Sequence, residues 1–577
     1  MTERTYALES QYAIVFQPHG REAVRPTPRH VYQRLEAFVR KRCSTLPTRD
    51  HAGVFLENGG LLQFEGDLDE GVIQVTTPEC RSARQAVIYQ EAMDALLSGI
   101  LPDLNARLRL EGYEGVVVLG RNTTDNKGHF YESQEHYAVS GARRAWYLRP
   151  LMACFTALFT PLQAVAGALP MVPLLFLLGV SRLGALLLRA RPAVAQRWSE
   201  RCLRWTEKVV LGVSRSAADV LSPLVAWYVA LVSNTVYAPY IGELTAFIVT
   251  RPIWCGSGRL KMPASPGQSP FQLMQKSDAM GAVTGVCRPG VQRPIYDFKS
   301  LFTHPMAVLR PVVRLQVCYS DSNMSEQISW LKLAVTGLLL QMIEDGIRFD
   351  VRLASPMQAL RRVSADVSLE RPVAVVGRGE VTALSIQAHY LEVARQYFEV
   401  HPGDGSAARI LGVWEELLRS VAQAGQARPV WTVDWSAKRA LMAEALCDMA
   451  SIEDLALVRT WAEEIVNAGE NFDVLSQAGE VGIDLRLRTV LTARAYVTLN
   501  HYRHARRLLW ADFLKLLQLS WQVEKIDLKY HQVGSEGYAH QLVEGGLMPR
   551  MSCAQELRTA QTVPPGTARP VAAVSLN

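Results

Sequence analysis

The sequence lacks the short motifs that mark many enzyme classes and many cell compartments. Its nine cysteines are scattered and include no Cys-X-X-Cys pair, which indicates a reduced, intracellular chain. It has no polybasic tail and no run of like charges, and the net charge of +6 is small for 577 residues, so we expect no nucleic-acid partner. The patterns HExxH, GxxxxGK[ST] and GxSxG are absent, and the first residues show no signal-peptide pattern.

One long apolar segment stands out from this composition. Leu151 to Val180 are thirty residues without a charge, broken by three prolines and flanked by arginines on both sides. About 20 apolar residues cross a bilayer once, so one crossing fits and two do not. Basic residues at both ends favour two cytoplasmic ends. We therefore expect a hairpin that dips into the membrane through residues 151–188 and holds a cytoplasmic protein at the membrane surface. The alternative is a buried helical hairpin at a dimer interface.

The remaining chain divides by pattern. Residues 1–140 alternate strand-like and helical patterns, and 141–233 form the apolar insertion. Residues 234–550 resume the mixture and become mainly helical from Ser355 onward, while 551–577 are rich in proline and alanine and predict a flexible tail. Strands first and helices later predict an α+β protein.

A polar stretch, Asp321-Ser322-Asn323-Met324-Ser325-Glu326, precedes a helix that is apolar on almost every side. Ser322 or Asn323 can cap this helix, and Gly346 can end it. A glutamate in the first turn is stabilised by the helix dipole. The alternative interpretation is that this stretch faces an active site that holds metal and phosphate.

Five separated stretches, in this order, carry a family resemblance: ALESQYAIV (7–15), VFLENGGLLQFEG through TTPEC (54–80), RNTTDNKGHFYESQEHY (121–137), FIVTRPIWCGSGRL with FQLMQKSD (247–278) and VRLQVCYSDSNMSEQISWLKL (313–333). They resemble the Pup ligase and Pup deamidase/depupylase family (proteasome accessory factors). That family lies in the carboxylate-amine ligase superfamily, related to glutamine synthetase. The resemblance implies a curved antiparallel sheet followed by a helical half, with residues 1–140 and 234–550 forming one catalytic domain around the apolar helical insertion.

The resemblance also implies a chemistry. ATP phosphorylates a glutamate side chain of the small protein Pup, and a protein lysine then attacks the acyl phosphate; in the depupylase branch, water cleaves the bond instead. Mg²⁺ takes carboxylate and phosphate oxygens as ligands and offsets phosphate charge. The implied cofactors are therefore ATP and Mg²⁺, and the implied partners are a Pup-like protein or peptide and a lysine-bearing protein.

Site residues follow from the matched motifs. The resemblance implies metal ligands at Glu9, Glu79 and Glu135, and nucleotide contacts at Arg251, Arg314, Asn323, Glu326 and Arg569. It implies a catalytic carboxylate at Glu65, with Asp67 as the alternative in a shifted alignment. Residues from both sides of the insertion should then line one pocket. Taken singly, Glu9 also fits an exposed strand carboxylate, and Glu65 fits a surface glutamate in an acidic loop.

Several positions depart from the family pattern. Gln11 and Gln74 stand where the family has glutamate, and Gln134 and Gln316 stand where it has histidine. Glutamine keeps a carbonyl oxygen but loses the charge, which weakens Mg²⁺ binding. Two hypotheses result: an ATP- and Mg²⁺-dependent enzyme of the ligase or depupylase type, or a catalytically weakened, membrane-tethered homologue that serves as binding or scaffold partner of an active paralogue. A small-molecule amide ligase is a third.

Overall fold

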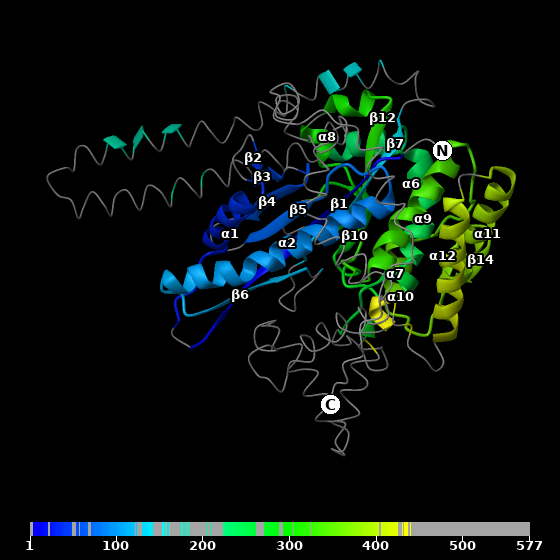
Figure 1. The fold of residues 1–577 in the computed structure, drawn as a ribbon. Coiled ribbons are helices and arrows are strands. Elements are labelled where there is room, and N and C mark those ends of the chain that lie inside the picture. The colour runs from blue at the N-terminus through cyan, green and yellow to red at the C-terminus, as the bar shows by residue number, and fades with distance from the viewer. Residues whose placement is uncertain are drawn as a thin grey trace, which may run out of the picture.

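The structure is a computed structural model (Figure 1). It describes residues 4–439 except for 21–22, 49–52, 57, 67–70, 122, 124–129, 261–270, 288–291, 304, 324, 403–404, 425–429, 431 and 437–438, and except for most of 142–222, where only scattered positions are described. Residues 440–577 lie outside this set, and with them the predicted tail 551–577 and Arg569.

Strands dominate the part before the insertion and helices the part after residue 326. The strands are β1 (Tyr6–Pro18), β2 (Thr45–Pro47), β3 (Gly53–Leu56), β4 (Leu61–Gly66), β5 (Gly71–Thr76), β6 (Gly115–Gly120), β7 (Ser133–Ser140), β8 (Arg259–Leu260), β9 (Phe271–Gln272), β10 (Met280–Gly285), β11 (Arg293–Asp297), β12 (Val312–Val317), β13 (Pro372–Val375) and β14 (Gly379–Thr382). The helices are α1 (Pro28–Arg42), α2 (Ala83–Leu110), α6 (Ala238–Thr250), α7 (Pro252–Cys255), α8 (Ser300–Thr303), the 3₁₀ turn η2 (Pro305–Leu309), α9 (Glu326–Glu344), α10 (Pro356–Ser364), α11 (Ala383–Val400) and α12 (Ser406–Ala424).

Ten of the strands form one sheet. Its order is β10-β11-β12-β7-β1-β5-β4-β3-β2, and β6 also pairs with β1. Every pair in it is antiparallel except β10 with β11. Strands from both sides of the insertion meet in this sheet, because β7 pairs with β12. The predicted α+β fold is confirmed.

The sheet has one apolar face and one polar face, because side chains alternate along each strand. On β1, Leu8 and Tyr12 are buried in the hydrophobic core, whereas Glu9 and Gln11 point to the opposite face. The helices α2 and α9 pack against the apolar face, where β1 and β7 meet them. The polar face is therefore where functional side chains can gather.

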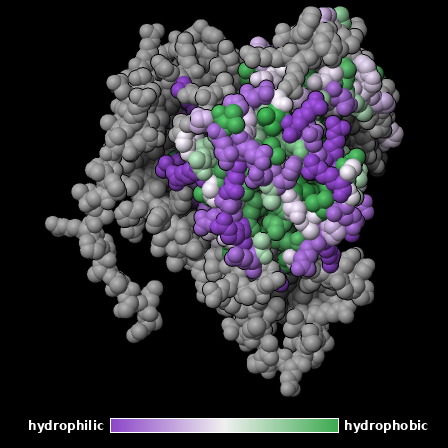
Figure 2. Space-filling model, turned by 90° about the vertical axis from the view of Figure 1, so that its right-hand side faces the viewer, coloured by the Kyte–Doolittle hydropathy of each residue, from purple (hydrophilic) through white to green (hydrophobic). Residues whose placement is uncertain are grey.

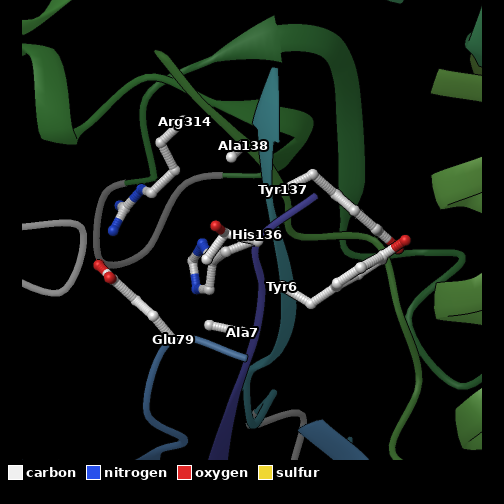
Figure 3. Close-up of a pocket in the computed structure, with 8 residues that line it drawn as sticks. Tyr6, Ala7, Glu79, His136, Tyr137, Ala138 and Arg314 are labelled. Carbon is white, nitrogen blue, oxygen red and sulfur yellow. The ribbon is translucent and has the colours of Figure 1, made fainter. Parts of the chain in front are cut away.

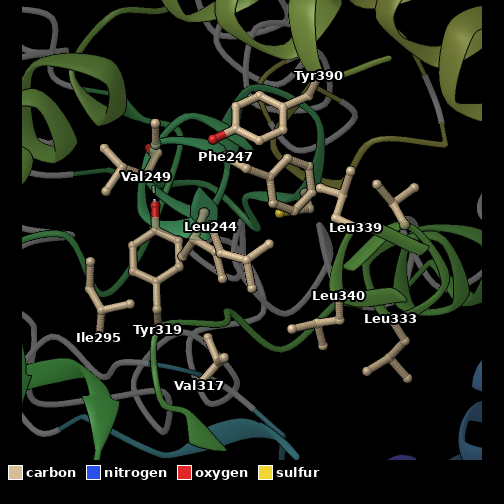
Figure 4. Close-up of a cluster of buried hydrophobic side chains, with 14 of the residues drawn as sticks. Leu244, Phe247, Val249, Ile295, Val317, Tyr319, Leu333, Leu339, Leu340 and Tyr390 are labelled. Atoms are coloured by element: carbon tan, nitrogen blue, oxygen red, sulfur yellow. Dashed lines mark hydrogen bonds between the residues drawn. The ribbon is translucent and has the colours of Figure 1, made fainter. Parts of the chain in front are cut away.

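Helix α9 is the centre of the core. Most of its residues are buried, and α6, α11 and α12 pack against it. Figure 4 shows Leu333, Leu339 and Leu340 of this helix beside side chains of α6 and the ring of Tyr390. On the outer side of this helical layer, the described surface is largely hydrophilic, with hydrophobic side chains showing between the polar ones (Figure 2).

The predicted N-cap of α9 is wrong, whereas the predicted end of the helix is found. Ser325, and not Ser322 or Asn323, is the N-cap, and its side chain accepts a hydrogen bond from the backbone N–H of Ile328. The preceding polar residues instead bond to other segments. Gly346 lies just beyond the helix with a φ of 94°, a left-handed conformation that glycine adopts at little cost, as predicted.

The insertion leaves and returns at nearly the same place. The Tyr240 hydroxyl at the start of α6 donates to the Ser140 carbonyl at the end of β7, at 2.8 Å. Among the described residues no single helix is long and apolar enough to span a membrane, although the bent pair Pro223–Ser233 and Ala238–Thr250 passes on length and composition together. Its second helix belongs to the core, since most of it is buried. Most of 151–188 lies outside the described residues.

Gly337 on α9 provides a test of the packing between this helix and the sheet. A Cβ built on Gly337 would lie 2.9 Å from ring carbons of Tyr6 and closer still to its hydroxyl. We expect Gly337→Ala to lower the free energy of unfolding by about 1–3 kcal/mol. Gly412→Ala is the matched control, because α12 is open there and the substitution should stabilise by about 0.5–1 kcal/mol. Chemical denaturation measures both, and equal effects would contradict the close approach.

Candidate functional site

Polar side chains from five neighbouring strands share the polar face. Strand register pairs Glu9 with Gln134, Gln11 with Gln74, and Gln74 with Gln63, and paired residues point to the same side. By the same register the polar face comprises Glu9, Gln11, Gln63, Glu65, Gln74, Gln134, His136, Arg314 and Gln316. The four glutamines that replace family residues thus lie together on one surface.

Three carboxylates gather on this face. His136 Nε2 lies 3.4 Å from Glu9 Oε2, and Glu65 accepts a hydrogen bond from the Gln11 amide at 2.7 Å. Glu132, directly before β7, forms an ion pair with Arg293 at 2.7 Å. Burial raises the pKa of Glu9 and of Glu132, and the charges of Glu9 and Glu65 raise that of Glu132 further, against the opposing effect of Arg293. Two buried carboxyls are thus held in an environment that disfavours their charged forms.

A small pocket adjoins Glu9. Figure 3 shows Glu79, His136 and Arg314 around one space, with Tyr6 and Tyr137 directed away from it. Burial and the charge of Arg314 hold the pKa of His136 well below its ordinary value, so the imidazole is neutral at pH 7. Arg314 Nη2 donates to Gln316 Oε1 at 2.6 Å, while the buried Arg314 Nε has no hydrogen-bond partner. An oxyanion could satisfy that donor.

Glu135 and Arg251 do not belong to the polar face. Register places Glu135 opposite Leu8 and Val317, on the apolar face of the sheet, and its neighbours in sequence point the other way. Arg251 binds it with both terminal nitrogens, at 2.8 and 3.1 Å, and both side chains are fully buried. Burial opposes the anion, but Arg251 and Lys332 outweigh it and lower the pKa of Glu135. The prediction that Glu9 and Glu135 line one pocket is therefore wrong: Glu135 forms a buried ion pair behind the sheet.

The polar stretch before α9 is a buried junction. The side-chain amide of Asn323 donates to Asp434 Oδ2 at 2.6 Å and to the Cys255 carbonyl, and its Oδ1 accepts a hydrogen bond from the Lys332 ammonium. The carboxylate of Asp321 accepts hydrogen bonds from the backbone N–H groups of Ser257 and Gln275. Both polar side-chain atoms of Asn323 are thus bonded to protein groups, whereas Glu326, the first residue of α9, is partly exposed. The nucleotide roles assigned to these two residues stay predictions.

Two charged residues of this region were not among the site residues predicted from the sequence. Glu132 lies within reach of the charges of Glu9 and Glu65, and Lys276 is fully buried beside it. The Lys276 ammonium donates to the carbonyls of Ser133 and Cys318, and burial, aided by Arg293, lowers its pKa to about 8. Glu132 lies in the matched stretch YESQEHY and Lys276 in FQLMQKSD. Considering every charged residue of the matched stretches, and not only those of the known motifs, would have included both.

The donor set of the polar face suits a hard divalent cation. Carboxylate and amide oxygens are the ligands that Mg²⁺ prefers, and Glu9, Glu132 and the glutamine carbonyls supply them. The raised pKa values of Glu9 and Glu132 fit this interpretation, because a bound cation would stabilise the charged forms that burial now disfavours.

A mainly antiparallel sheet with an oxygen-rich face, backed by helices, makes this an α+β protein. A model of the Pup-ligase protein family matches residues 7–460, and the chain belongs to this family. It is 26% identical over 449 residues to a Pup–protein ligase of Kineococcus radiotolerans, covering 77% of this chain and 74% of that one. The ligase of Actinosynnema mirum is 25% identical over 490 residues, covering 83% of each.

The fold also resembles a solved structure. A crystal structure of the complex between prokaryotic ubiquitin-like protein Pup and its ligase PafA superposes with a TM-score of 0.52 at 19% identity, covering 87% of this chain and 84% of that one. At this identity the likeness concerns the fold.

Glu135→Gln separates a structural role from a metal-binding role. The substitution leaves the Arg251 charge buried without its partner, so we expect the free energy of unfolding to fall by about 3–5 kcal/mol. Glu380→Gln is the control, because Glu380 is 59% exposed and its loss should cost at most about 1 kcal/mol. A Glu135→Gln variant that keeps wild-type stability and loses only Mg²⁺ binding would restore the metal-ligand interpretation.

Proposed function

We propose that this chain is an ATP- and Mg²⁺-dependent ligase that joins a glutamate carboxylate of a Pup-like protein to a lysine amine of a target protein. The observation that carries the proposal is the gathering of Glu9, Glu65 and Glu132 on the polar face beside Arg314. Both curated relatives described above are named ligases, which favours conjugation over the hydrolytic direction.

The chemistry requires two displacements. The glutamate carboxylate attacks the γ-phosphorus of ATP and ADP departs with the bonding electrons; the lysine amine then attacks the acyl carbon and phosphate departs. Bound Mg²⁺ would offset the charge of the phosphates. Arg314 would bind a phosphate oxygen through its unbonded Nε, and Glu9 and Glu132 would hold the cation. Glu65, exposed at the edge of the face, would accept the proton that the amine loses.

The glutamines support a second candidate. Gln11, Gln74, Gln134 and Gln316 share the polar face, and Gln316 donates to Gln134 across the β7–β12 pair. A face with fewer charges binds Mg²⁺ more weakly. The second candidate is therefore a homologue that binds a Pup-like protein or an active paralogue and turns over slowly.

Glu65→Gln tests the ligase proposal. With ATP, Mg²⁺, Pup and a lysine-bearing protein, we expect the wild type to release ADP and form the conjugate, and the variant to do so about 10²–10⁴-fold more slowly. Glu65 is exposed, so the melting temperature should not change. Conjugates are followed by gel and ADP by coupled assay.

Glu114→Gln, another exposed glutamate outside the polar face, is the control and should keep full turnover. Mg²⁺-ATP should also raise the melting temperature of the wild type. Absence of turnover, together with retained binding of Pup, would replace the ligase proposal with the second candidate.

We further propose that residues 151–188 hold the protein at the cytoplasmic face of the membrane. Leu175 and Phe176 are described there and are 68% and 69% exposed, as large apolar side chains seldom are. The contact between Tyr240 and Ser140 fits a hairpin that returns to the side it left.

Vesicle flotation checks this proposal. The full chain should float with vesicles of anionic and neutral phospholipids, and the Leu175→Asp/Phe176→Asp variant should lose most of that binding, because buried charge is costly in hydrocarbon. Leu110→Asp is the control, since Leu110 is 82% exposed but lies on α2. Equal flotation of all three proteins would exclude a membrane contact through this hairpin.

A further inference from the structure

Three side chains with metal-binding atoms meet at the β11–β12 end of the sheet. Cys287 follows β10, Asp297 ends β11 and Cys318 follows β12. One sulfur or oxygen of each lies within 4.8 Å of those of the other two. The residues are 10 and 21 positions apart in the chain and form no sequence motif, so only the pairing of the strands brings them together.

The cluster is held by hydrogen bonds. Asp297 Oδ1 accepts from the backbone N–H of Cys287 at 2.9 Å and from that of Lys299 at 3.0 Å, which fixes both the carboxylate and the Cys287 loop. Cys318 Sγ accepts from the Gln316 amide at 3.6 Å, and Cys318 and Asp297 are 2% and 4% exposed. The side chains are therefore oriented before any ligand arrives.

We propose that Cys287, Asp297 and Cys318 bind a Zn²⁺ ion, with the fourth position open to water. Thiolate ligands select zinc over the hard ions Mg²⁺ and Ca²⁺, and zinc accepts a carboxylate as a third ligand. Tetrahedral Zn–S bonds of about 2.3 Å place two sulfurs about 3.8 Å apart, so the ligands need to draw together by roughly 1 Å at most. Cys287 is half-buried, which leaves a route for the ion.

This zinc site shares no ligand with the Mg²⁺ site proposed on the polar face, but it is coupled to it. The Gln316 amide that bonds Cys318 also donates to Gln134 on the polar face. Bound zinc would therefore fix Gln316 and offset the negative charge of Asp297 beside Glu9. The site stands on its own geometry and does not depend on the ligase activity.

Cobalt titration provides the test. Purified full chain, freed of metal with a chelator under reducing conditions, should take up one Co²⁺ per chain with the near-ultraviolet absorption of a cobalt–thiolate bond, and Zn²⁺ should displace it. Cys287→Ser should weaken metal binding at least about tenfold, as expected for loss of a ligand. Cys154→Ser is the matched control, because Cys154 is exposed and lies in the insertion, and it should leave the titration unchanged.

Cys287 is the position to substitute first because it is the least buried of the three. The melting temperature gives a second readout: Zn²⁺ should raise it in the wild type and should not raise it in Cys287→Ser. The proposal is overturned if the wild type binds no cobalt through thiolate or if Cys287→Ser binds as tightly as the wild type. It is equally overturned if mass spectrometry shows a Cys287–Cys318 disulfide that re-forms in air even with zinc in excess, which would make the pair a redox couple.

Discussion

The buried ion pair between Glu135 and Arg251 fixes much of this structure. Removing both charges from water costs several kcal/mol per ion, and only a two-point contact with further hydrogen bonds offsets that cost. Tyr137, Ser320 and Thr336 supply those bonds. The pair joins β7, which precedes the insertion, to three segments that follow it. By fixing Glu135 behind the sheet, it also fixes Gln134 and His136 on the polar face.

The order of strand-like and helical patterns predicted the α+β fold, and motif matching gave Glu9, Glu65 and Arg314, which the structure places on one face of the sheet. Motif matching predicted Glu135 for the same pocket. It failed at Glu135 for a physical reason: a match along the chain carries no information about faces, whereas adjacent residues of a strand point to opposite sides. The cysteine cluster was out of reach for another reason. Its members come from separate strand ends, and nothing local in the sequence specifies which strands become neighbours.

The polar face balances three carboxylates against three basic side chains. Glu9, Glu65 and Glu132 lie close to Arg314, Arg293 and Lys276, and amides occupy positions between them. The affinity of this face for a divalent cation would therefore depend strongly on whether a nucleotide is also bound. Phosphate oxygens carry negative charge, whereas the side-chain amides of the glutamines do not. A nucleotide and the cation would thus bind best together, each completing the other's surroundings.

The order of strands in the sheet has a consequence for synthesis. When β7 emerges from the ribosome, its sheet neighbour β1 has already been made, but its other neighbour, β12, is made only after the whole apolar insertion has been translated. Until then one edge of β7 has no strand partner. The carboxylate of Glu135 likewise has no ion-pair partner until Arg251 has been made. Pairings so distant in the chain form slowly and leave intermediates prone to aggregation. The nascent protein therefore meets its surroundings with the insertion already synthesised and the ten-stranded sheet still incomplete, which makes this the stage at which a chaperone or a lipid surface would matter most.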